Sequence, residues 1–111
     1  MIARTWIGVT PAERSEEYWQ YLQRTGLADY RATPGFRWIT VLRRVADGRA
    51  EFNLTTFWDS LDAIRAFAGE EVERARYYAE DEEFLLEMAP KVEHREVLAW
   101  PGGEGAGDPK P

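Results

Sequence analysis

Residues 57–84 constrain the fold more than any other stretch, because they join the end of a strand to a capped amphipathic helix. Phe57 and Trp58 are typical of a strand, and the next two residues, Asp59 and Ser60, offer side-chain oxygens to the free amides of a helix start. Four apolar residues then recur at helical spacing: Leu61, Ile64, Phe67 and Ala68. Because this helix is apolar on one face only, it needs a sheet to cover.

The chain on either side of this helix supplies that sheet. Strand patterns cover residues 2–9, 36–45, 49–58 and 92–100, and Asp47-Gly48 predicts a tight hairpin between the second and the third. A first helix begins at Thr10-Pro11 and ends near Gly26, whereas after Gly69 we expect further helical segments up to Met88. The order β-α-β-β-α-β, with right-handed crossovers, predicts an α+β, ferredoxin-like, four-stranded antiparallel sheet with helices on one face.

The other face of this sheet is also apolar, and it has no helix to cover it. We expect it to carry Trp6, Trp38, Leu42, Leu54 and Trp58. A sheet that is apolar on both faces has to be covered on both. The sequence therefore predicts a homodimer in which this uncovered face meets a second copy of the chain.

Composition limits the partners. The net charge is −6 without a basic stripe, which argues against nucleic acid and against an anionic membrane surface. The chain has no cysteine, no signal-like start and no apolar run of about 18 residues, so we expect a cytoplasmic protein. Residues 1–100 are expected to form one domain, and residues 101–111, rich in Gly and Pro, a disordered tail.

The run TTFWDSLDAIRAFAGEEVERARYY, followed by EDEEFLLE and VEHREVL, resembles the antibiotic biosynthesis monooxygenase superfamily of dimeric α+β barrels. The TPGF turn and the segment YLQRTGLADY resemble an uncharacterised bacterial branch of it. The resemblance covers residues 2–98. It implies a pocket in each subunit between the sheet and the helices.

Two kinds of activity are implied by the resemblance. Haem-degrading members hold their cofactor with Asn, Trp and His residues, and the corresponding positions in this sequence are Thr5, Phe67 and Tyr77, none of which is the family's residue. Cofactor-independent members oxidise phenolic polyketides with O₂, in pockets that use Asn, Trp and Tyr groups. Asn53, Trp58 and the pair Tyr77-Tyr78 are the candidates for these groups, and we expect no cofactor.

His94 is the only histidine. An imidazole titrates near neutral pH, so it suits the removal of a phenolic proton. Alternatively, His94 is a strand residue at the barrel seam, where Glu93, Arg95 and Glu96 favour an ion network. One histidine cannot build a multi-histidine metal site, and the acidic residues 80–83 lack the spacing of a calcium loop, so we expect no metal.

The remaining candidates are polar or aromatic. Asn53 lies in an apolar strand, where it either orients a ligand or bonds across the sheet. Either Arg4 or Arg37 is able to bind a substrate carboxylate, although an ion pair with a strand glutamate is the favoured alternative. The predicted catalytic set is His94, Asn53 and Tyr77, and the predicted substrate-binding set is Thr5, Trp19, Phe57, Trp58, Phe67 and Tyr78.

Two classes of function follow. One is a cofactor-independent monooxygenase, or a related small enzyme, that acts on an aromatic or polyketide-like molecule. The other is a non-catalytic, ligand-binding or stress-related barrel protein. An apolar cavity with converging polar groups favours the enzyme, whereas a cavity filled by Phe67 and Tyr77 favours the binding protein.

Overall fold

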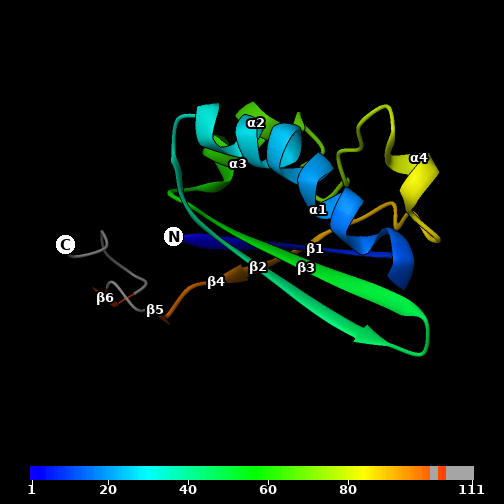
Figure 1. The fold of residues 1–111 in the computed structure, drawn as a ribbon. Helices are drawn as coiled ribbons and strands as arrows, with labels where there is room; N and C mark the ends of the chain where they lie inside the picture. The colour runs from blue at the N-terminus through cyan, green and yellow to red at the C-terminus, as the bar shows by residue number, and fades with distance from the viewer. Residues whose placement is uncertain (101–102, 105–111) are drawn as a thin grey trace.

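The structure is a computed structural model, and it describes residues 1–100 and 103–104 (Figure 1). The strands are β1 (Ile2–Pro11), β2 (Phe36–Ala46), β3 (Arg49–Trp58), β4 (Glu93–Glu96), β5 (Ala99–Trp100) and β6 (Gly103–Glu104). The helices are the 3₁₀ turn η1 (Ala12–Arg14), α1 (Ser15–Arg24), α2 (Gly26–Ala32), α3 (Leu61–Ala68) and α4 (Asp81–Phe84).

The main sheet has the strand order β2-β3-β1-β4, and every neighbouring pair is antiparallel. The helices all lie on one side of it (Figure 1). This arrangement confirms the ferredoxin-like α+β fold. The two central strands, β1 and β3, carry the groups that face the helices.

Local sequence signals explain the turns between these elements. Asp47 and Gly48 both have positive φ, 54° and 75°, as a two-residue hairpin between twisted strands requires. The Ser60 hydroxyl accepts a hydrogen bond from the Ala63 amide at 3.2 Å, which confirms the cap of α3. Gly69 has a φ of 89° and ends α3.

The assignment of residues to the two faces of the sheet was partly wrong. Trp6, Leu54 and Trp58 face the helices and are buried in the core, whereas Trp38 and Leu42 lie on the open face and are 57% and 58% exposed. Register decides this, because successive residues of a strand alternate between faces. The apolar content of each strand did not reveal which set the helices cover.

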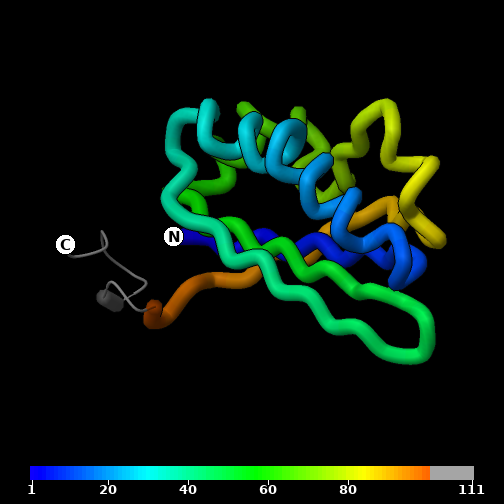
Figure 2. The backbone as a smooth tube through the Cα atoms, viewed as in Figure 1, coloured from blue at the N-terminus to red at the C-terminus, as the bar shows by residue number. Residues whose placement is uncertain are grey.

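Three predicted segments differ from the structure. β1 runs to Pro11 and the Thr10 hydroxyl donates to the Pro11 carbonyl, so Thr10 does not cap a helix. Residues 69–80, which were expected to be partly helical, are irregular and follow the helix side of the sheet (Figure 2). The strand predicted over residues 92–100 is divided into β4 and β5.

The predicted disordered tail falls mostly on residues 101–102 and 105–111, which lie outside the described residues. Gly103–Glu104 pairs with β5 as β6. None of the helices within residues 1–100 is long and apolar enough to cross a membrane.

Candidate functional site

A small pocket lies between the sheet and the helices. β1 and β3 supply its floor, α1 and α2 one wall, and the irregular segment with α4 the other. Its free volume is about 20 Å³, enough for roughly one water molecule. The residues that line it are Arg4, Trp6, Tyr18, Leu22, Gly26, Tyr30, Leu54, Arg76, Tyr78 and Asp81.

Arg4 is the cation of this pocket. Its position on β1 turns it toward the helices, and it is only 2% exposed. Its Nη2 donates to the Arg74 carbonyl at 3.0 Å, and the Phe67 ring lies 5.5 Å from its guanidinium carbon. Burial lowers the pKa of Arg4, while the nearby Tyr30 hydroxyl acts in the opposite direction. A buried guanidinium without a carboxylate partner is costly, so this residue marks the site.

Asp81 is the acid of the pocket and is 3% exposed. It accepts hydrogen bonds from the Tyr18 hydroxyl at 3.2 Å and from the Tyr78 amide at 2.5 Å. Burial raises the pKa of Asp81, and these two hydrogen bonds oppose that rise. No ion pair between described residues joins Arg4 to Asp81: both Asp81 oxygens accept hydrogen bonds from tyrosines, whereas Arg4 keeps an unsatisfied Nε.

Three phenols complete the lining. Burial is the largest cause that raises the pKa of Tyr18, Tyr30 and Tyr78, and the hydrogen bonds to Asp81 and Asp29 raise it further for Tyr18 and Tyr78 respectively. These groups therefore stay protonated at neutral pH. They act as hydrogen-bond donors rather than as bases.

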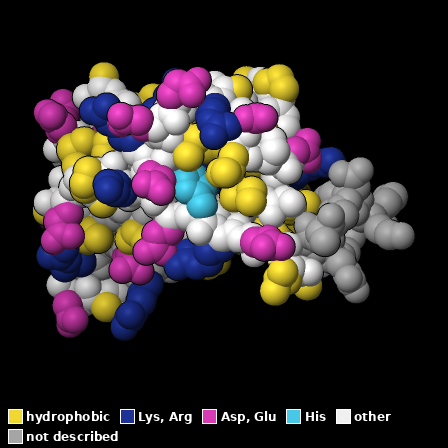
Figure 3. All heavy atoms as spheres, turned by 180° about the vertical axis from the view of Figure 1, so that it is seen from behind, with side chains coloured by type: hydrophobic (Ala, Val, Ile, Leu, Met, Phe, Trp, Pro, Cys, Tyr) yellow, Lys and Arg dark blue, Asp and Glu magenta, His cyan; other side chains and the backbone are white. Residues whose placement is uncertain are grey.

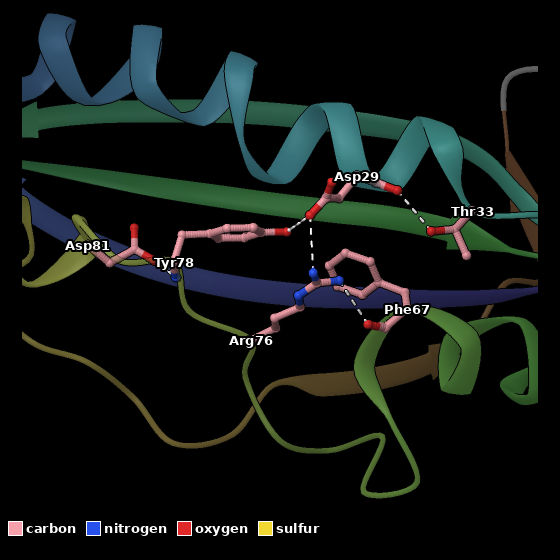
Figure 4. A network of polar contacts seen from close by, with 6 residues as sticks. All are labelled: Asp29, Thr33, Phe67, Arg76, Tyr78 and Asp81. Atoms are coloured by element: carbon pink, nitrogen blue, oxygen red, sulfur yellow. Dashed lines mark hydrogen bonds and ion pairs between the residues drawn. The ribbon is translucent and has the colours of Figure 1, made fainter.

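A polar network closes the pocket from the side of the irregular segment (Figure 4). Arg76 donates to the Phe67 carbonyl at 3.0 Å and pairs with Asp29 of α2 at 3.2 Å. The Tyr78 hydroxyl donates to the same Asp29 oxygen at 2.7 Å. Residues 76–78 are thus tied to both α2 and α3, and this connection covers Arg4 and Tyr30.

His94 lies on β4 directly opposite Arg4 of β1. It is the one cyan side chain in Figure 3, with hydrophobic side chains beside it. Its Nε2 is buried and has no hydrogen-bond partner. Burial lowers the pKa of His94, the Arg4 charge lowers it further, and Glu73 opposes both effects. It adjoins the pocket through Arg4 rather than lining it.

Three candidates lie on the opposite face of the sheet, and placing them in the cavity under the helices was wrong. Thr5, Asn53 and Phe57 belong to the alternate set of strand residues, which the helices do not cover. Thr55 lies between two of them, with its hydroxyl 3.0 Å from the Thr5 hydroxyl and donating to Asn53 at 2.8 Å. Thr5 and Asn53 line a separate depression of about 410 Å³ on the open face.

The other aromatic candidates have four different surroundings. Trp19 lies in a surface depression with Val41, Arg43 and Phe52, away from the pocket. Tyr78 lines the pocket, Phe67 and Trp58 pack behind Tyr30 at ring distances of 4.6 and 6.2 Å, and Tyr77 binds Trp6 and the Ala89 carbonyl through its hydroxyl.

Sequence reasoning missed Tyr30 and Asp81 as site residues and favoured an ion pair for Arg4 that is not formed. A usable signal existed for Asp81, because it stands three and four residues before the buried Phe84 and Leu85, which places it on the inner face of a helical turn. Arg4 lies two residues before Trp6 on β1, so the two side chains share one face of the sheet. Nothing local marks Tyr30.

Within the described part of the chain, no three acidic, histidine or cysteine residues gather in a way that suits a metal ion. The pocket instead combines a buried cation, a buried carboxyl group and aromatic walls. Such a set suits a small aromatic ligand with an acidic proton or a negative charge.

Comparisons with known proteins support the fold. No family model matches the sequence, and no curated protein matches it. A crystal structure of MhuD, in a variant with one arginine replaced by serine and with two manganese protoporphyrin IX molecules bound per active site, matches with a TM-score of 0.61. The identity is 20%, over 93% of this chain and 100% of that one. The likeness shows the fold alone: this chain has a ferredoxin-like α+β fold similar to that of MhuD.

The residues that are present do not fit a porphyrin in this arrangement. The pocket holds about 20 Å³, far less than such a ring needs. Phe67 has no ligand atom, and the Tyr77 hydroxyl is bound to Trp6 and Ala89. His94 reaches the region only from the edge strand β4.

Proposed function

We propose that this protein is a small-molecule enzyme of the cofactor-independent monooxygenase type, which binds an aromatic substrate in the pocket of Arg4 and Asp81. One observation carries the proposal: two buried groups of opposite charge line the same pocket without pairing with each other. Perturbed, unpaired ionisable groups in an enclosed site are typical of functional sites. The reaction type is taken from the sequence resemblance described above, because a likeness in fold does not determine a reaction.

Each group has a separate task in this reaction. Asp81, whose pKa burial raises, removes the acidic proton of a phenol or of its keto form, because a less acidic carboxyl group is a stronger base. Arg4 stabilises the resulting anion in surroundings without water. The anion reduces O₂: a ring CH₂ group becomes a carbonyl with one oxygen atom, and the second oxygen leaves as water with both hydrogens.

Access requires a movement of the chain, since the present volume holds about one water molecule. The segment of residues 69–80 has no regular structure and covers the pocket through Arg76 and Tyr78. Its displacement opens the site, as the loops that cover many active sites do.

The test is oxidation of a panel of anthrones and hydroquinones under air. We expect a rate above buffer for the wild type and a loss of about 100-fold in Asp81→Asn. Glu82→Gln is the matched control, because Glu82 is the next acid of the same helix and is exposed. Since the catalytic roles of His94, Asn53 and Tyr77 remain proposals, His94→Ala, Asn53→Ala and Tyr77→Phe are measured beside them.

A second candidate is a non-catalytic protein that binds such a molecule. The hydrogen bonds to both Asp81 oxygens favour it, because a carboxylate that is already satisfied is less available as a base. A ligand that raises the melting temperature without turnover would support binding alone. If no compound of the panel turns over or shifts the melting temperature, both proposals fail.

A further inference from the structure

Arg4 carries a buried positive charge that no acid balances. The side chain lies in the middle of the sheet, between Thr56 of β3 and His94 of β4, and is 98% removed from solvent. None of the ion pairs formed within the described residues includes it, and its neighbours are the Arg74 carbonyl, the Tyr30 hydroxyl and the Phe67 ring. A guanidinium in this position lacks the counter-charge that burial normally requires.

The unsatisfied hydrogen-bond donor lies on one edge of the guanidinium. The Nε–H and one Nη2–H point in the same direction, and together they match the two oxygens of a carboxylate. Here Nη2 donates to the single oxygen of the Arg74 carbonyl at 3.0 Å, while Nε is buried with no partner. A lone carbonyl oxygen therefore satisfies half of an edge that a carboxylate would satisfy completely.

A second unsatisfied nitrogen lies beside it. His94 is the cross-strand partner of Arg4 on the same face of the sheet, and its Nε2 is also buried without a hydrogen bond. Of the three buried side-chain nitrogens without a partner in residues 1–100, two are thus on neighbouring side chains; the third is on Trp100. The charged groups that act on His94 are Arg4 and Glu73.

One short segment covers both groups. Glu73 acts on His94, and the next residue, Arg74, gives its carbonyl to Arg4. The segment is held by hydrogen bonds from the Val92 amide to the Glu73 carbonyl at 2.7 Å and from the Ala75 amide to the Pro90 carbonyl at 2.9 Å. These few contacts are what a ligand has to displace.

We propose that Arg4 and His94 form a binding site for the carboxylate of a small aromatic acid, and that the Arg74 carbonyl oxygen takes the place of that carboxylate when no ligand is bound. The aromatic body of the ligand lies against Phe67 and Tyr30, whose rings are 4.6 Å apart next to the guanidinium. This inference deepens the proposed function by naming the charged group of the substrate, and it rests on that function only for the use of the pocket.

The test is binding in the absence of oxygen, so that turnover plays no part. The probes are 2-naphthoate and the neutral 2-naphthamide, which has nearly the same shape. We expect the wild type to bind the carboxylate and to bind the amide at least about 10-fold more weakly, since charge-assisted hydrogen bonds are lost. In the ¹H–¹⁵N NMR spectrum of the protein, we expect the Arg4 Nε–H signal to shift when the carboxylate is added and to stay in place when the amide is added.

Matched variants separate binding by the Nε–Nη2 edge of Arg4 from a general effect of positive charge. Arg4→Gln is expected to lose at least about 10-fold in affinity for 2-naphthoate. Arg95→Gln removes a positive charge next to His94 on β4, from a side chain that is 64% exposed and outside the proposed site, and is expected to bind like the wild type. His94→Gln is expected to bind more weakly than the wild type and more tightly than Arg4→Gln.

Equal affinity for the carboxylate and the amide would overturn the inference, as would an equal loss in Arg95→Gln and Arg4→Gln. If Arg4→Gln does not fold, the probe comparison and the Nε signal of the wild type still decide. Turnover of neutral anthrones without preference for the carboxylate would reject this inference and keep the proposed function. Carboxylate binding without any turnover would keep this inference and reject the proposed function.

Discussion

Asp29 of α2 accepts a hydrogen bond from the hydroxyl of Tyr78 at 2.7 Å, across 49 residues of chain. The same carboxylate oxygen pairs with Arg76 at 3.2 Å. One acid thereby connects the irregular segment to the helical layer over the pocket (Figure 4). Asp29 thereby holds two residues of the cover at once, beside the hydrogen bonds that join Arg4 to Arg74 and Tyr21 to Glu80.

We predict that Asp29→Asn loosens this cover. The ion pair with Arg76 is partly exposed and contributes little, whereas the hydrogen bond from Tyr78 to a charged acceptor contributes more. The free energy of unfolding in urea should fall by about 1 kcal/mol. Amide hydrogens of residues 70–80 should exchange faster, because their local opening costs less.

Asp62→Asn is the control for this change. Asp62 pairs with Arg65, three residues along α3, on the exposed side of that helix. It takes no part in the network of Asp29, Arg76 and Tyr78. It should leave both the urea midpoint and the exchange of residues 70–80 unchanged. An equal effect of the two variants would show that Asp29 has no special role.

We predict a homodimer formed through the open face of the sheet. Ile7, Trp38 and Leu42 are 39%, 57% and 58% exposed there, a patch that soluble monomers rarely leave in water. Trp38→Glu should shift the sedimenting species from dimer to monomer at micromolar concentration, because a charge in an apolar interface loses its hydration without gaining a partner.

Val45→Glu is a matched control for that experiment. Val45 is also 57% exposed and lies on the same strand, but its register places it on the other face of the sheet. The control should remain a dimer. A wild type that sediments as a monomer would refute the prediction.

We predict that His94 destabilises the fold as the pH falls. Its pKa in the folded protein is lowered by burial and by Arg4, so the unfolded chain takes up the proton first. The contribution of His94 to stability is therefore complete above the ordinary histidine pKa of about 6.5 and is lost as the pH falls through the lowered value.

The measurement is the melting temperature of wild type and His94→Gln between pH 8 and pH 5, roughly the range in which an imidazole titrates. The wild type should lose more stability than the variant over this range. Parallel curves would mean that His94 has the same proton affinity in the folded and unfolded chains.

We predict that hemin does not bind tightly. The sequence resemblance places the cofactor-holding residues of haem-degrading proteins at Thr5, Phe67 and Tyr77. Thr5 lies on the open face, and the Tyr77 hydroxyl is already bonded to Trp6 and Ala89. Titration should give no sharp Soret band at one equivalent per subunit. If such a band appears and disappears in His94→Ala, His94 is the ligand and the cover opens further than proposed.

Much of the fold was readable from the sequence because its signals are local. The Asp47-Gly48 turn, the Ser60 cap and the Gly69 stop each depend on the backbone preferences of one or two residues, and all three are confirmed. The order of the elements then leaves the ferredoxin-like sheet as the natural arrangement.

Only the tertiary structure decided what each strand face meets. A shift of one residue exchanges the faces, so Thr5 and Asn53 lie on the open side while Arg4 lies in the core. The site combines Arg4, Tyr30 and Asp81, which are separated by dozens of residues and share no local pattern. Their meeting depends on how the irregular segment folds back over the sheet, and long-range packing sets that path.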